Sequence, residues 1–165
     1  MKLTLQGHDE RYLIETLALL FFPAAGFSAQ LEDGLSATSR LEGRTAFTSI
    51  TAHGVSASAQ DEARPDEQPA AALARSFYQA GAQLTGISPP WGTLTGIRPA
   101  KLVRRLLDAG LTEQQAAQKL LLDCYTAPEK TMLCAGVLRS EQEALSLLNP
   151  RAVSIYVGIP FCPSR

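Results

Sequence analysis

The residues of this chain that could bind a metal, a cofactor or a charged substrate are its cysteines, its histidines and one group of basic residues. The 165 residues include three cysteines, Cys124, Cys134 and Cys162. Their spacing matches no disulfide framework, so reduced thiols are the simplest interpretation. The two histidines have no second ligand at metal-like spacing, which argues against a self-contained zinc site. Cys124 and Cys134 lie in predicted helices among apolar neighbours, where a cysteine usually packs as a small apolar side chain.

Cys162 stands apart because it follows a run of β-favouring residues. The run from Ala152 to Ile159 is almost continuously apolar, which is typical of a strand buried on both faces of a parallel sheet. The sequence then continues Pro160-Phe161-Cys162. From the residues alone, packing as a small apolar side chain is the favoured interpretation of Cys162.

A group of basic residues forms the second candidate site. They share one side of a predicted helix, opposite its leucines: Arg98, Lys101, Arg104 and Arg105. Arginine binds carboxylates through two parallel hydrogen bonds, so this face could meet a polycarboxylate. The favoured alternative is a solvated face, or one docked on the acidic N-terminal half of the chain. Nucleic-acid binding would need a larger basic surface with interleaved aromatic residues, which is missing.

Composition limits the class of protein. Hydrophobic residues make up 45% of the chain and charged residues 19%, so a packed core is expected rather than disorder. The net charge of −1 argues against a polycation that binds nucleic acid or a membrane surface. The longest apolar run, Ile14 to Ala25, is too short to span a bilayer and resembles no signal peptide. We therefore predict a soluble, cytoplasmic protein.

Residues 1–88 are predicted to form a small α+β module. The pattern indicates a strand, a helix that Asp9 caps and Pro23 ends, three more strands, a polar loop and a second helix. Asp33-Gly34 is expected to be a hairpin turn. The expected strands cover 2–6, 27–31, 35–41 and 45–51, the loop covers 56–69, and the second helix covers about 70–82.

Residues 89–149 are predicted to form a helical segment, and residues 150–165 begin something else. Pro89-Pro90-Trp91 cannot be helical and marks a boundary. Three helices follow: one bracketed by Pro99 and Gly110, one from Thr112 to about Tyr125, and one from Thr126 that Asn149-Pro150 ends. The second and third are expected to start at capping boxes headed by Thr112 and Thr126. The strand 152–159 would then be the first strand of a truncated parallel β/α barrel, a partial TIM-type barrel.

Two stretches resemble a known family. Tyr156-Val157-Gly158-Ile159-Pro160-Phe161-Cys162 is similar to the start of the cluster-binding motif of the oxygen-independent coproporphyrinogen III oxidase-like radical S-adenosylmethionine enzymes. The stretch from Pro90 to Lys101 resembles a signature upstream of that motif in the HemZ branch of the family. The two lie about sixty residues apart, in the expected order. With both resemblances, the favoured interpretation of Cys162 becomes a cluster ligand.

The resemblance implies a cofactor set and roles for individual residues. Cys162 would be the first thiolate ligand of a [4Fe-4S] cluster, and Tyr156 would contact S-adenosylmethionine, although packing in a core remains an equal alternative for Tyr156. The other two cluster cysteines would fall four and seven residues past Cys162, beyond Arg165. Arg98 and Lys101 are possible substrate contacts, and no catalytic residue is assigned. Gly158 departs from the family, which often has histidine there.

The resemblance also implies an activity for the whole protein. It would oxidatively decarboxylate two propionates of coproporphyrinogen III to vinyl groups, using an electron donor, with no nucleic-acid or membrane partner. The 165 residues alone are expected to be inactive. Two alternatives stay open: another radical S-adenosylmethionine protein or haem-trafficking relative, and a non-enzymatic accessory module.

Overall fold

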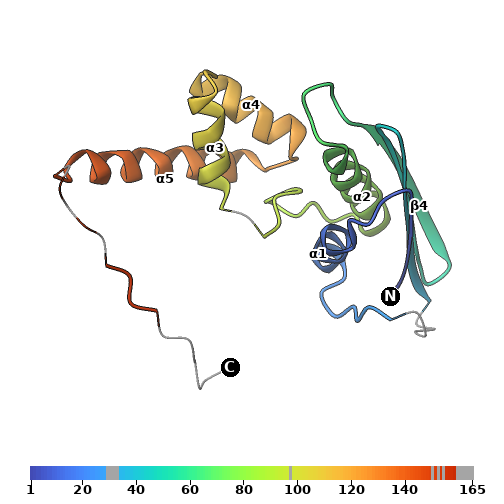
Figure 1. The fold of residues 1–165 in the computed structure, drawn as a ribbon. Helices are drawn as coiled ribbons and strands as arrows, with labels where there is room; N and C mark the ends of the chain where they lie inside the picture. The colour runs from blue at the N-terminus through green and yellow to red at the C-terminus, as the bar shows by residue number, and fades with distance from the viewer. Residues whose placement is uncertain (29–33, 97, 150, 152, 154, 159–165) are drawn as a thin grey trace.

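The N-terminal half is a four-stranded sheet with two helices packed on one of its faces (Figure 1). The computed structural model describes residues 1–28, 34–96, 98–149, 151, 153 and 155–158. In spatial order the strands run β1-β2-β3-β4, with β1 parallel to β2 and the other neighbours antiparallel. The predicted α+β class is confirmed. The elements are β1 (Lys2–Gln6), α1 (Arg11–Phe21), β2 (Leu35–Glu42), β3 (Thr45–Ala52), β4 (Val55–Glu62) and α2 (Pro69–Thr85).

The sheet is one-sided because its strands alternate between apolar and polar residues. On β3, Ala46, Thr48 and Ile50 are buried beneath the helices, whereas Phe47 and Ser49 between them face outward. The helices contribute Ile14, Leu17 and Phe77 to the same core. The side of the sheet away from the helices is left open to solvent.

Strand β4 corrects the prediction that residues 56–69 form a loop. Its sequence is built of serine and alanine rather than large apolar residues, so its hydropathy resembles that of a loop. Only small side chains such as Ala57 fit between the sheet and α2, and the strand forms because it completes the hairpin with β3. The turn is His53-Gly54, where both residues have positive φ, as tight two-residue hairpin turns require.

The cap predicted for α1 is wrong, and the strand expected after α1 is not confirmed. Asp9 does not cap the helix: Glu10 occupies the N-cap position without a side-chain cap, and the Asp9 carbonyl accepts the Arg11 N–H at 2.6 Å. The expected strand 27–31 is absent at Phe27 and Ser28, while 29–33 lie outside the described residues. Asp33 of the expected Asp33-Gly34 turn lies outside the described residues as well. Leu35 opens a strand that pairs parallel with β1, because α1 carries the chain back across the sheet.

The helical half consists of α3 (Pro99–Asp108), α4 (Glu113–Asp123) and α5 (Pro128–Ser146), packed around a second core. The capping box at Thr112 is confirmed, with Thr112 and Gln115 each satisfying the other's backbone N–H. The one predicted at Thr126 is wrong, because α5 starts one residue later with Ala127 at the N-cap and Pro128 in the first turn. Buried side chains of this core are Val103, Ala116, Leu120, Cys134 and Leu138.

The predicted barrel strand is not confirmed. Within 151–158, the described residues belong to no strand, and Val153, Ile155 and Val157 are exposed. A buried parallel strand needs neighbouring strands to take up its backbone hydrogen bonds, and the described sheet lies elsewhere in the fold (Figure 1). Across the described residues, no helix combines the length and the apolar character needed to cross a membrane.

Candidate functional site

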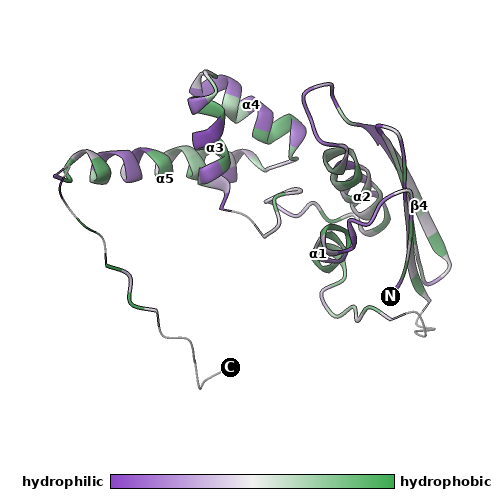
Figure 2. Cartoon of the chain, in the orientation of Figure 1, coloured by the Kyte–Doolittle hydropathy of each residue, from purple (hydrophilic) through white to green (hydrophobic). Residues whose placement is uncertain are grey.

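The basic face of α3, formed by Arg98, Lys101, Arg104 and Arg105, lies on the surface of the helical half. Arg98 occupies the N-cap position, and helical periodicity places Lys101 and Arg105 on the same side of α3. Hydrophilic residues cover much of this helix in Figure 2. Arg104 forms a loose ion pair with Asp108 at 3.8 Å, whereas Arg98 and Lys101 are exposed and form no ion pair within the described ranges. The face is therefore solvated and is not docked on the acidic half.

In the segment that follows α5, residues 150–165 (the tail), the one described candidate residue is Tyr156, and it is exposed to solvent. The Tyr156 side chain is 94% exposed, so it packs in no core here. Residues 155–158 lie apart from the packed helices (Figure 1). Cys162 lies outside the described residues. The structure thus does not bring Tyr156 together with Arg98 or Lys101.

Cys124, at the C-cap of α4, and Cys134, inside α5, sit where a thiol stays protonated. Burial, together with the nearby Asp123 carboxylate, raises the pKa of Cys124 to about 11. Burial also raises the pKa of Cys134, which is packed inside the helical core. In the part of the chain that the structure describes, no group of three or more His, Cys, Asp or Glu side chains could hold a metal ion. These thiols have the surroundings of packing residues, as expected.

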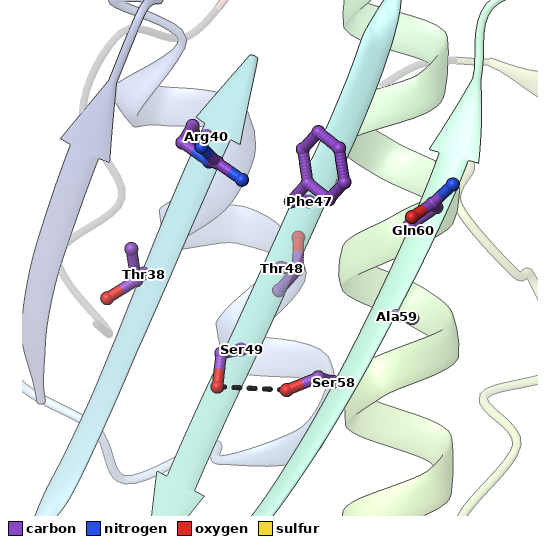
Figure 3. A pocket seen from close by; sticks show the side chains of 8 residues that line it. All are labelled: Thr38, Arg40, Phe47, Thr48, Ser49, Ser58, Ala59 and Gln60. Carbon is purple, nitrogen blue, oxygen red and sulfur yellow. Dashed lines mark hydrogen bonds between the residues drawn. The ribbon is translucent and has the colours of Figure 1, made fainter. Parts of the chain in front are cut away.

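A shallow hollow of about 460 Å³ lies on the sheet (Figure 3). The Arg40 guanidinium stacks over the Phe47 ring, 4.5 Å from its centroid, and pairs with Glu42. The Ser58 hydroxyl donates a hydrogen bond to Ser49 at 3.1 Å. No base lies beside these hydroxyls among the lining residues, so the hollow holds no activated nucleophile. Its lining is Thr38, Arg40, Phe47, Thr48, Ser49, Ser58, Ala59 and Gln60.

A buried ion network is the polar centre that sequence reasoning missed. Arg75 is only 4% exposed, and it pairs with Asp61 at 2.8 Å and Glu67 at 2.9 Å. Its guanidinium also donates to the Glu62 carbonyl. The sequence carries one indication of this network: Arg75 lies in the mostly apolar stretch of α2, and four acidic residues precede it, Asp61, Glu62, Asp66 and Glu67.

The same network reaches the helical half. Arg64 contacts Glu67 at 3.1 Å and also Asp123, at the end of α4, at 2.6 Å. Burial would raise the pKa of Glu67, but hydrogen bonds from Arg75 and the Arg64 backbone N–H outweigh it, so the Glu67 pKa lies below its usual value. Glu67 therefore stays ionised beside Arg75, and this paired arrangement suits a structural clamp better than acid–base catalysis.

The predicted boundary segment is a packed junction between the two halves. The Tyr78 hydroxyl donates to the Pro89 carbonyl at 3.1 Å, and its ring stacks on Tyr125 with centroids 5.2 Å apart. The Thr93 N–H donates to the Cys124 carbonyl at 2.8 Å. Trp91 packs against the second core, with the Lys130 ammonium 5.5 Å from its ring centroid.

Comparison with known proteins identifies one relationship. Over 83 residues the chain is 42% identical to the oxygen-independent coproporphyrinogen-III oxidase-like protein HemZ of Bacillus subtilis (strain 168). This chain is a relative of HemZ. The aligned part makes up 49% of this chain and 17% of HemZ, so the chain spans less than a fifth of that relative's length. No family model and no solved structure matches.

The stretch that resembles a HemZ-branch signature connects the junction to α3. This stretch, Pro90 to Lys101, begins in the junction and ends in the first turn of α3. Its first residues contact the helical half: Gly92 is buried, and the Pro90 carbonyl accepts the Ala127 N–H at 2.9 Å. Its last residues include the exposed Arg98 and Lys101. The start of this stretch therefore packs in the junction, and its end carries two exposed cationic side chains that form no ion pair among the described residues.

Proposed function

We propose that this chain is the N-terminal part of a HemZ-like radical S-adenosylmethionine oxidoreductase. The reaction is the oxidative decarboxylation of coproporphyrinogen III propionates to vinyl groups. The observation that carries the proposal is the 42% identity to HemZ over 83 residues. The resemblance of Tyr156 to Cys162 to a cluster-binding motif supports the radical class.

In this proposal the tail supplies the first contacts to the cofactors. Cys162 gives one thiolate to a [4Fe-4S] cluster, and Tyr156 contacts S-adenosylmethionine. The exposed Tyr156 ring is free of core packing, which leaves it available for this contact. When bound, the cofactors supply the electron transfer and radical chemistry, and the protein holds and shields them.

The basic face supplies the substrate contacts. Coproporphyrinogen III carries four propionates, and guanidinium and ammonium groups bind carboxylates. Arg98 and Lys101 are the suited members because both are exposed and, among the described residues, neither is committed to an ion pair. Arg104, by contrast, lies near Asp108.

The nucleotide sequence after Arg165 tests the function class directly. The proposal requires cysteine codons four and seven positions past Cys162, completing the three-thiolate motif. A stop codon after Arg165, or a frame without these cysteines, would contradict the enzyme and favour a non-enzymatic accessory module.

The substrate contacts are tested by titrating the chain with coproporphyrin III, the stable oxidised tetracarboxylate. Replacing Arg98 and Lys101 together by Gln is expected to weaken binding by roughly tenfold or more, because two charged hydrogen bonds are lost. The melting temperature should not change, since neither side chain has a partner in the described fold. Arg11→Gln, an exposed change on α1, is the control and should bind as the parent does. Equal binding by parent and double variant would remove the assignment.

A further inference from the structure

Among the described residues, strand β4 has no partner strand along one whole edge of the sheet. It is last in the strand order, and its one described neighbour is β3. The tight turn makes Ala52 and Val55 a hydrogen-bonded pair, and such pairs alternate along an antiparallel ladder. The backbone N–H and C=O groups of Ser56, Ser58 and Gln60 therefore point out of the sheet.

From Val55 to Gln60 this edge lacks the usual features that prevent strand pairing, and its two charged residues, Asp61 and Glu62, lie together at the end of the strand. Proteins protect edges with short strands, lysine, proline or bulges. The opposite edge follows that rule, because β1 has five residues and carries the exposed Lys2. Strand β4 has eight residues with unbroken register from Val55 to Glu62, and none of them is lysine or proline. Of its two acidic residues, Asp61 is turned inward to Arg75.

We propose that β4 pairs antiparallel with β4 of a second copy of this chain, so that the two sheets become one continuous sheet. The two-fold axis passes beside Ser58. Ser58 then faces its counterpart, and Ser56 faces Gln60 of the other copy. Each of these facing pairs exchanges two backbone hydrogen bonds. The inference is independent of the proposed function.

The pairing is self-complementary, which is why a second copy is the fitting partner. In this register Glu62 faces Gly54 and Asp61 faces Val55, so no carboxylate faces another carboxylate. Side chains keep their faces: Ala57 lies opposite Ala59 on the helix side, and serines meet on the open side. These small side chains allow the strands to approach to the normal spacing, about 4.8 Å. The open-face ladder of Ser49 and Ser58 hydroxyls would continue across the axis.

Sedimentation equilibrium of the 165-residue chain tests the proposal across the micromolar range. The parent is expected to dimerise with rising concentration. Ser58→Lys places two ammonium groups face to face at the axis and should weaken dimerisation by roughly tenfold or more. Ser49→Lys is the matched control, because it breaks the same Ser49–Ser58 hydrogen bond on the same face but lies on an inner strand. It should dimerise as the parent does.

Amide hydrogen exchange provides a second readout that does not depend on a variant. In the dimer, the amides of Ser56, Ser58 and Gln60 should become protected as the concentration rises, while the amides of β1 should not change. A parent that stays monomeric with these three amides exchanging freely would overturn the proposal. A dimer that Ser58→Lys leaves intact would overturn it as well.

Discussion

Arg75 shows how a single buried charge can be held at low cost. Its guanidinium is almost inaccessible to solvent, yet Asp61, Glu67 and the Glu62 carbonyl together satisfy its donors. Removing one partner of a buried pair leaves the other uncompensated, which is why such pairs are costly to break even where they add little net stability. Arg75 therefore ties the end of β4 to α2.

Glu67 is predicted to make stability fall in acid. Its folded-state pKa lies below the ordinary value of 4.5, so the stability it contributes is complete above pH 4.5 and is lost as pH falls through the folded-state pKa. Glu67→Gln should lower the free energy of unfolding by roughly 1–3 kcal/mol at pH 7, because it removes charged hydrogen bonds with Arg75. The gap between parent and variant should close as the pH is lowered.

Urea unfolding across this pH range measures the effect. Glu42→Gln is the control, because its carboxylate pairs with Arg40 in an exposed position and should change the unfolding free energy by less than about 1 kcal/mol. A gap for Glu67→Gln that stays constant from pH 7 to acid would contradict the role assigned to the carboxylate.

At the scale of elements, the two threonines that precede α4 and α5 are expected to behave in opposite ways. Thr112 caps α4 through its side chain, so Thr112→Ala should cost about 1 kcal/mol. Thr126 is buried, and its hydroxyl has no hydrogen-bond partner among the described residues. Thr126→Val keeps the shape and removes an unsatisfied hydroxyl, so it should leave stability unchanged or raise it. Thermal unfolding compares the two, and a larger loss from Thr126→Val would be inconsistent with the structure.

The helices were predictable from the sequence because their signals are local. Pro99 and Pro128 fix first turns, and the apolar stripe of α3 is visible in a window of ten residues. The helix start predicted at Thr126 was wrong because the capping-box pattern overlaps with Pro128. The proline occupies the first turn and sets the start of the helix.

The loop predicted over β4 was wrong and the barrel strand was not confirmed, because strand formation depends on neighbouring strands rather than on local signals. Ser56 to Gln60 have little apolar character, yet β3 and α2 hold them in the sheet. The run from Ala152 to Ile159 has strong β character, but its described residues have no adjacent strand. The polar groups differ in the same respect. The exposed side of α3 could be predicted from helical periodicity, whereas the Arg75 network joins residues from separate elements and has no local sequence pattern.

At the scale of the whole molecule, the junction joins two cores through backbone contacts as well as side chains. Gly92 has a φ of +58°, and an added Cβ there would collide with the backbone of Cys124 and Tyr125. The close approach lets the connection between the sheet half and α3 lie directly against the loop before α5. The ion pair of Arg64 with Asp123 reinforces the same contact. The two halves are thus fixed together, and α3 is held with its basic face outward.

In the proposed enzyme, Cys162 would anchor a cluster that cleaves S-adenosylmethionine. The most direct measurement is the 5′-deoxyadenosine formed by the anaerobically reduced product of the complete reading frame, with and without coproporphyrinogen III. Cys162→Ala should lower this yield by at least roughly tenfold, because the cluster loses an anchoring thiolate. Cys124→Ala, which changes a protonated thiol in the junction, should retain it. A yield that Cys162→Ala leaves unchanged would contradict the account, and cleavage that ignores coproporphyrinogen III would contradict the assigned substrate.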